Sequence, residues 1–296
     1  MRIGITGVTG FIGTALAKAA VGRGHEIVAY SRRKDMAFPW AKEVRAFDPA
    51  LNAVLDPSGL DVLVHLAGEN VLGYWTANKK ARIRDSRVQT TQKIVSAMRD
   101  CAQRPQAFIC ASASGVYGNR GDEVLTESSP RGAGFLADVC EEWESAAMAA
   151  DAFGVRIAML RTGMVLGRDG GAWPLLRRIF SLGLGSRLGS GSQWVPWIHV
   201  DDEVGIILHT IEQSFYHGPV NLAAPEHVSN AQLTRAIAAQ LGRFTLPPVP
   251  AFMLRLVLRD LSGVVLDSQR MVPKAALEGG YAFAYPSLKQ ALAALV

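Results

Sequence analysis

Residues 1–13 read Met-Arg-Ile-Gly-Ile-Thr-Gly-Val-Thr-Gly-Phe-Ile-Gly, and this stretch decides the fold. A short apolar run typical of a buried strand leads into the evenly spaced glycines Gly7, Gly10 and Gly13. The first glycine permits a tight turn, the second lets backbone approach a ligand, and the third allows a helix to pack closely on the strand. An apolar helical pattern follows, and a second strand is expected at 26–30, completing a strand–helix–strand unit. The pattern predicts pyrophosphate binding at the helix N-terminus.

The turn and the end of the second strand together predict the cofactor. We expect the turn to contact it through Gly7, Thr9, Gly10, Phe11, Ile12 and Gly13. An acidic residue ending the second strand would bind the ribose 2′-hydroxyl of NAD, but the sequence there is Tyr30-Ser31-Arg32-Arg33-Lys34. Ser31 offers a hydroxyl and Arg32 a guanidinium suited to a 2′-phosphate, whereas Arg33 and Lys34 are expected to be solvated. NADP(H) is therefore the predicted cofactor.

Strand and helix patterns alternate along the first half of the chain. Apolar runs at 44–47, 61–68, 107–111 and 155–160 predict further strands, and 76–98 predicts a helix. This alternation indicates an α/β fold with a doubly wound parallel sheet. We expect a Rossmann domain at 1–165, to which later segments return, with a substrate lobe at 166–246 and a C-terminal extension at 247–296.

Composition narrows the class of protein. The 296 residues are 49% hydrophobic and carry a net charge of +5, which suits an anionic ligand. The basic residues are scattered and no nucleic-acid-binding motif accompanies them, so no nucleic-acid partner is expected. Cys101, Cys110 and Cys140 lack metal-site spacing and are predicted to be reduced thiols. Without a signal-peptide pattern or a membrane-length apolar run, we expect a cytoplasmic protein with no membrane partner, or an organellar one if a transit peptide was removed.

The glycine spacing resembles that of the extended short-chain dehydrogenases/reductases, which include nucleotide-sugar epimerases and dehydratases. The resemblance implies that Leu66, Ala67 and Gly68 line the cofactor pocket, and that Arg87 stands where relatives place an asparagine facing the nicotinamide half. It also implies a catalytic Tyr-x-x-x-Lys pair, in which lysine lowers the tyrosine pKa. That pair is missing. The two matching registers hold Phe135 with Val139 or Leu136 with Cys140.

Several further motifs resemble those of an atypical epimerase-like family in this superfamily. The shared motifs are Gly68-Glu69-Asn70, Lys80-x-x-Ile83-x-x-Ser86-Arg87, Phe135-Leu136 ahead of Trp143-Glu144, Arg161-Thr162-Gly163-x-Val165-Leu166-Gly167, Pro196 to Asp202, Ser268-Gln269-Arg270-x-Val272-Pro273 and Gly280 to Pro286. The resemblance spans the whole chain, includes a small C-terminal extension, and implies an NADP(H)-binding Rossmann protein with an unassigned substrate. Members are sometimes labelled cell-division inhibitors, which no residue here supports.

The remaining candidate residues would act in catalysis or contact the substrate. Ser112 and Tyr117 follow the strand whose end should face the nicotinamide, and we predict Tyr117, assisted by Ser112 and by a charge from Arg87, as the acid/base. Glu69, Asn70 and Ser114 are candidate substrate contacts, although Glu69 is equally suited to cap the next helix.

The sequence also bears on whether the chain binds a metal and on which activity it has. His199, Asp201 and Asp202 are interpreted as a helix cap with a structural histidine, and no metal is expected. The chain is predicted to be an NADP-dependent oxidoreductase or epimerase acting on a small polar or anionic substrate. The alternative is a catalytically silent NADP(H)-binding sensor or scaffold. The sequence leaves the oligomeric state open.

Overall fold

The computed structural model describes residues 1–33, 35–51 and 54–296, so Lys34 lies outside the described part. Its centre is a seven-stranded parallel sheet with the order β13-β7-β5-β4-β1-β2-β3. The strands are β1 (Arg2–Thr6), β2 (Glu26–Ser31), β3 (Glu43–Ala46), β4 (Val62–His65), β5 (Ala107–Ala113), β7 (Arg156–Thr162) and β13 (Gly218–Leu222). The chain leaves β1 toward β2 on one side and returns to β4 on the other, so the strand order reverses beside β1. Open sheets of this kind bind ligands outside the carboxyl ends of the strands at such a point.

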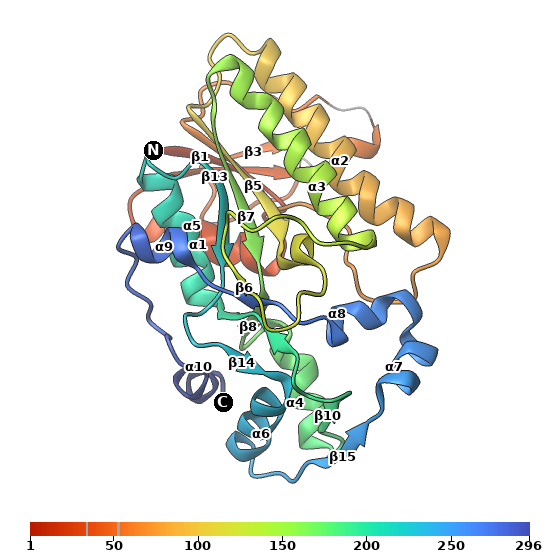
Figure 1. The fold of residues 1–296 in the computed structure, drawn as a ribbon. Helices are drawn as coiled ribbons and strands as arrows, with labels where there is room; N and C mark the ends of the chain where they lie inside the picture. Colours follow the sequence, from red (N-terminus) through yellow and green to blue (C-terminus); the bar gives the residue numbers. More distant parts are fainter. Residues whose placement is uncertain (34, 52–53) are drawn as a thin grey trace.

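Helices cover both faces of the sheet (Figure 1). They are α1 (Phe11–Gly22) with α5 (Val200–Glu212) on one face and α2 (Ala77–Asp100) with α3 (Phe135–Met148) on the other. Each pair closes its own apolar core against the sheet. Because α5 and β13 come late in the chain, segments beyond residue 165 complete the Rossmann domain.

A smaller lobe packs beyond the carboxyl edge of the sheet (Figure 1). Its elements are β8 (Met164–Gly167), β9 (Gly170–Gly171), α4 (Trp173–Ser181), β10 (Ser186–Leu188), β11 (Trp194–Val195), β12 (Trp197–His199), β14 (Val228–Ser229) and α6 (Asn230–Gln240). The C-terminal part adds β15 (Leu246–Val249), α7 (Ala251–Leu258), α8 (Gly263–Leu266), β16 (Arg270–Met271), α9 (Lys274–Glu278) and α10 (Leu288–Leu295). Short 3-10 segments lie at Pro49–Leu51, Ser114–Tyr117, Ala149–Phe153 and Arg259–Ser262, and β6 spans Val124–Leu125. No helix among the described residues is long and apolar enough to cross a membrane.

The C-terminal extension is tied back to the Rossmann domain through Ser268. The Ser268 amide donates to Asn119 Oδ1 at 3.0 Å, and its hydroxyl donates to the Gly121 carbonyl at 2.6 Å. The same hydroxyl accepts the Trp194 amide at 3.0 Å. Next to it, β16 pairs with β6. The Ser-Gln-Arg motif of the extension is therefore a structural clasp between the domain and the lobe.

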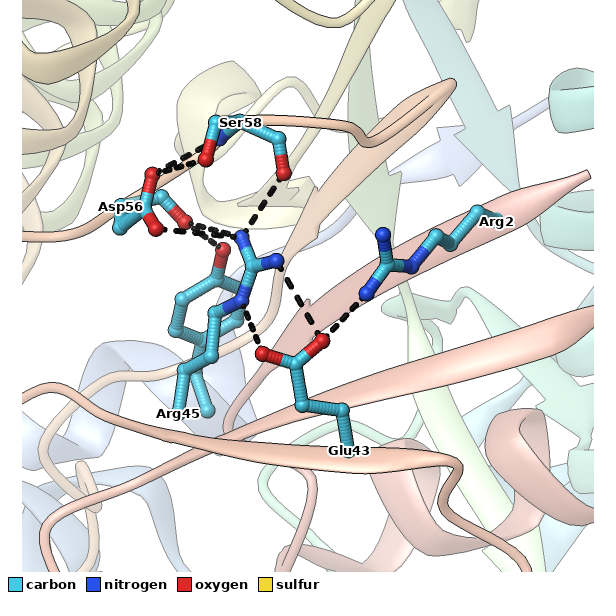
Figure 2. A network of polar contacts seen from close by, with 6 residues as sticks. Arg2, Glu43, Arg45, Asp56 and Ser58 are labelled. Carbon is cyan, nitrogen blue, oxygen red and sulfur yellow. Dashed lines mark hydrogen bonds and ion pairs between the residues drawn. The ribbon is translucent and has the colours of Figure 1, made fainter.

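A polar network centred on Arg45 lies beside the end of β2 (Figure 2). Ser31 is the last residue of β2, and Arg32 follows it. Arg45 donates to Glu43 Oε1 at 2.8 Å and to the carbonyls of Asp56 and Ser58 at 2.8 and 2.9 Å. The buried Tyr30 hydroxyl donates to the same Asp56 carbonyl. Desolvation by burial raises the pKa of Tyr30 to about 12, so this donor keeps its proton at physiological pH.

A buried acidic side chain, Glu203, lacks a partner for one of its two oxygens among the described residues. Glu203 on α5 is 1% exposed, and its Oε1 accepts the Thr162 hydroxyl at 2.9 Å. Its Oε2 has no hydrogen-bond partner among the described residues. Burial raises the pKa of Glu203 to about 8, because a desolvated carboxylate is unfavourable. The side chain is therefore largely protonated at neutral pH.

Glu203 makes stability depend on pH. Between its ordinary pKa of 4.5 and about 8, the folded protein retains a proton that the unfolded chain has released. The free energy of unfolding should therefore fall as the pH rises through this window, by at most about 1.4 kcal/mol per pH unit. Glu203→Gln should flatten that dependence in urea denaturation, whereas the exposed Asp201→Asn should retain it. An identical slope in the parent and Glu203→Gln would contradict the assignment.

Candidate functional site

The turn between β1 and α1 leaves no room for side chains at two of its glycines. Gly7 has φ +72°, and a Cβ on it would lie 2.7 Å from the Ala67 amide nitrogen at the end of β4. A Cβ on Gly13 would lie 2.3 Å from the Gly7 carbonyl oxygen. Gly10 is different, because its backbone is extended and a Cβ there would meet only the Gly7 oxygen at 3.1 Å. Gly10 is thus an exposed position at which a side chain would intrude on a bound ligand more than on the fold.

The start of α1 presents free donors. Gly10 is the N-cap residue, and no side chain of the described residues caps the helix. The first-turn N–H groups and the positive end of the helix dipole are therefore available to an anion. Phe11 has a further role that the sequence analysis missed, because its ring packs where side chains on Gly167 and Gly170 would stand. Those two glycines let the β8–β9 hairpin close over α1.

The end of β2 places Ser31 and Arg32 differently. Ser31 is buried, and its hydroxyl oxygen accepts the Arg33 amide at 3.2 Å. Arg32 is exposed, and its guanidinium forms no ion pair or hydrogen bond with the part of the chain that the structure describes. The Arg33 guanidinium instead contacts the Met36 sulfur at 3.6 Å. Arg32 is therefore the cation left free beside the expected ribose.

The end of β4 brings Gly68, Glu69 and Arg87 together. Arg87 on α2 donates to the carbonyls of Glu69 and Ile83 at 3.1 and 3.0 Å, and a Cβ on Gly68 would lie 3.4 Å from its Cζ. Glu69 does not cap the helix: Thr76 is the N-cap, and the Glu69 carboxylate binds Lys79 Nζ at 2.7 Å. That bond holds the pKa of Glu69 below its ordinary value. The capping alternative for Glu69 is therefore wrong.

The other two candidate substrate contacts are less constrained. Exposed Asn70 accepts the Leu72 amide at 2.9 Å in a local turn. Ser114 begins the 3-10 segment after β5, and its hydroxyl has no hydrogen-bond partner within the described residues.

A buried polar network underlies the end of β5. Ser112, which is 5% exposed, donates to Glu144 Oε1 at 2.6 Å. Glu144 receives a two-pronged contact from Arg161, Nε to Oε1 at 2.9 Å and Nη2 to Oε2 at 2.8 Å. The side chains of this pair are only 12% and 10% exposed. Because the Ser112 hydroxyl donates its hydrogen bond to the Glu144 carboxylate, its oxygen can still accept a hydrogen bond from a ligand.

The structure contradicts the acid/base role predicted for Tyr117. Its side chain is 0% exposed, and the hydroxyl donates to Asn221 Oδ1 at 2.6 Å while accepting Arg161 Nη1 at 2.9 Å. Burial raises the pKa of Tyr117, the wrong direction for proton transfer near neutral pH. The neighbouring cation is also Arg161 and not Arg87. Tyr117 is therefore a packed structural residue whose partners come from distant segments.

The positions matching the absent catalytic pair carry no phenol or amine. Phe135 begins α3, and its ring packs edge-on to Trp75 with centroids 5.2 Å apart. Leu136 lies against Gly115, and Cys140 is buried. Burial raises the pKa of Cys140 to about 12, so its thiol stays protonated. None of these four matching side chains can exchange a proton with a substrate at neutral pH.

Comparison with known proteins identifies the family to which this chain belongs. The model of the NAD dependent epimerase/dehydratase family matches residues 3–223, and a domain of unknown function matches residues 249–295. The chain belongs to the NAD dependent epimerase/dehydratase family. The family resemblance predicted from the motifs is confirmed, including the separate C-terminal extension.

Relatives align with this family member from end to end. The epimerase family protein SDR39U1 of Homo sapiens is 34% identical over 305 residues, covering 100% of both chains. The chloroplastic SDR39U1 homologue of Arabidopsis thaliana is 36% identical, covering 100% of this chain and 87% of the relative. The crystal structure of human SDR39U1 with NADPH superposes with a TM-score of 0.89 at 33% identity, covering 100% and 99% of the two chains. The Bacillus cereus UDP-glucuronic acid 4-epimerase, at 19% identity and a TM-score of 0.77, shares the fold.

Glu144→Gln should destabilise the protein strongly. The change removes the only carboxylate bonded to Arg161 in the described chain and leaves a buried cation unpaired, at a cost of about 3 to 5 kcal/mol. Urea denaturation measures the loss. The matched control is Glu142→Gln, which lies on α3 like Glu144. It breaks an exposed ion pair with Arg84 of α2 and should cost under about 1 kcal/mol. Equal, small losses for both variants would show that the buried pair is not a structural anchor.

Proposed function

We propose that this chain binds NADP(H) across the carboxyl edge of its sheet and uses it on a small polar or anionic substrate. The observation that carries the proposal is the β1–α1 turn, where the extended, exposed Gly10 precedes a helix with uncapped N–H groups. That arrangement suits a pyrophosphate. The NADPH-bound human relative of the same fold and length supports it.

The 2′-phosphate is assigned to the end of β2. Arg32 is exposed and unpaired within the described residues, and its planar guanidinium matches a phosphate in a two-pronged contact. Ser31 precedes it and no carboxylate stands there to repel the phosphate. The adenine-side ribose would then run past Leu66, Ala67 and Gly68 after β4. The nicotinamide end would reach the strand ends near Ser112 and Arg87.

The reaction proposed is a reduction or epimerisation for which bound NADP(H) supplies or takes up a hydride. Ser112 would orient the substrate by accepting a hydrogen bond, since its own proton is held by Glu144. Ser114, whose hydroxyl is free within the described residues, would offer the nearby donor. Asn70 and Glu69 lie along the same edge and would contact a polar substrate.

A second candidate function is NADP(H) binding without turnover, as a sensor or scaffold. The observation favouring it is that Phe135, Leu136, Val139 and Cys140 offer no group that transfers a proton at neutral pH, while Tyr117 is buried. Oxidation of NADPH across a panel of carbonyl compounds distinguishes the two. Turnover that falls in Ser112→Ala supports the enzyme, whereas no turnover of any compound by the parent supports the silent binder.

Cofactor preference should depend on Arg32. NADPH should bind more tightly than NADH by about 1.5 to 3 kcal/mol, roughly 10- to 150-fold, because the guanidinium pairs with the 2′-phosphate. Arg32→Asp should reverse the order in a fluorescence titration. Arg33→Asp is the matched control and should retain the preference for NADPH. Equal affinities of the parent for both nucleotides would sink the assignment.

Gly10→Val should abolish cofactor binding and leave the fold intact. Its Cβ has only the Gly7 oxygen at 3.1 Å as a near neighbour, so the branched side chain would project chiefly into the pyrophosphate site. We expect an unchanged circular dichroism spectrum and at least a hundredfold loss of NADPH affinity, about 2.7 kcal/mol. Gly22→Val at the other end of α1, where no atom lies within 4 Å of the new Cβ, should bind normally. Parental affinity in Gly10→Val would move the pyrophosphate elsewhere.

A further inference from the structure

Arg87 is held rigidly at the edge of the proposed pocket. Its Nη1 donates to the carbonyls of Glu69 and Ile83, and its Cζ lies 5.2 Å from the centroid of the Trp143 ring. Gly68 leaves the space that the guanidinium occupies, since a Cβ there would stand 3.4 to 3.6 Å from its atoms. The guanidinium is thus contacted by residues of α2, of α3 and of the segment that follows β4.

Among the residues that the structure describes, no carboxylate forms a direct ion pair with Arg87, although Glu69 is near enough to favour its charge. The other cations in the first half of α2 each pair with a carboxylate: Lys79 and Arg82 with Glu69, Lys80 with Asp260, and Arg84 with Glu142. Arg87 binds only carbonyl oxygens and an aromatic face, although it is partly buried. Burial lowers the pKa of Arg87, and the nearby Cys140 and Glu69 offset only part of this effect. A partly desolvated cation of this kind is stabilised when an anion completes its coordination.

The cofactor's own anions already have partners in the proposed function. The pyrophosphate is assigned to Gly10 and the start of α1, and the 2′-phosphate to Arg32. Arg87 instead adjoins Gly68 on the side of α3, beside Cys140, whose pKa the guanidinium lowers against the larger effect of burial. A guanidinium has five N–H donors, and the carbonyl contacts use only Nη1. The remaining donors suit a planar, two-pronged contact.

We propose that Arg87 forms the recognition site for an anionic group of the substrate, a carboxylate or a phosphate. The inference rests on the proposed function and narrows its substrate class to anions. Neutral analogues of the same size would leave the guanidinium uncompensated and bind poorly. The Glu69 carboxylate pairs with Lys79 and Arg82 and forms no ion pair with Arg87 among the described residues.

The test uses acetate and inorganic phosphate as probes. Each is titrated by calorimetry, at constant ionic strength, into the full-length protein saturated with NADPH, so that the cofactor occupies its own phosphate sites. Acetamide is the neutral counterpart of acetate. The variants are Arg87→Met, Arg87→Lys to retain the charge if the Met variant does not fold, and Arg84→Met as an exposed control on the same helix. NADPH affinity is measured separately for every variant by fluorescence.

The expected result is that the parent and Arg84→Met bind at least one of the two anions and not acetamide. Arg87→Met should weaken that binding at least tenfold while changing NADPH affinity less than about threefold, and Arg87→Lys should retain it within about tenfold. Undiminished anion binding in Arg87→Met, or none by the parent, overturns the proposal. A parallel loss of NADPH affinity in Arg87→Met also overturns it, by assigning the group to the cofactor. If NADPH does not bind the parent, the proposed function fails, and the difference between parent and Arg87→Met in free protein still tests the anion site.

Discussion

The rest of the site depends on the close backbone contacts of the β1–α1 turn, because these contacts fix where α1 begins relative to the sheet. Gly7 lies against the start of the segment after β4, and Gly13 lies against Gly7 itself. These contacts set the first turn of α1 directly above the carboxyl ends of β1 and β4, where the strand order reverses. Uncapped N–H groups, the end of β2 with Arg32, and the end of β4 with Gly68 all converge there as a consequence. Cofactor binding in this fold is therefore a property of backbone placement first and of side chains second.

The substrate side depends on a different kind of constraint, a buried ion pair. Arg161 and Glu144 join β7 to α3, and through Ser112 and Tyr117 they reach β5 and the segment that follows it. Such a pair is costly to break because neither charge can return to water. The pair also orients Ser112, whose hydroxyl donates a hydrogen bond to Glu144. The positions that match the family's catalytic pair lie elsewhere on α3 and hold no proton donor, so we assign recognition of the substrate's charge to Arg87.

The sequence was most informative where structure is local. The glycine turn, the strand ends and a helix cap at the start of α5 follow from residues within a few positions of each other, and the structure contains them. The capping residue of α5 is His199 itself. Tyr117 could not be assigned from sequence, because its partners Asn221 and Arg161 lie 104 and 44 residues away. The capping alternative for Glu69 was wrong for a similar reason, because only the fold brings Lys79 to its carboxylate. The Ser268 clasp joins segments about half the chain apart and carries no local signal.

The central claim is that NADP(H) lies extended across this edge with its nicotinamide end toward Ser112 and Arg87. A crystal structure of the protein with NADPH tests it most directly. We expect the pyrophosphate over the first turn of α1, the 2′-phosphate against Arg32, and the nicotinamide ring beside the end of β5. A nucleotide with its 2′-phosphate away from Arg32, with its nicotinamide ring directed away from β5, or bound at any other surface would contradict it.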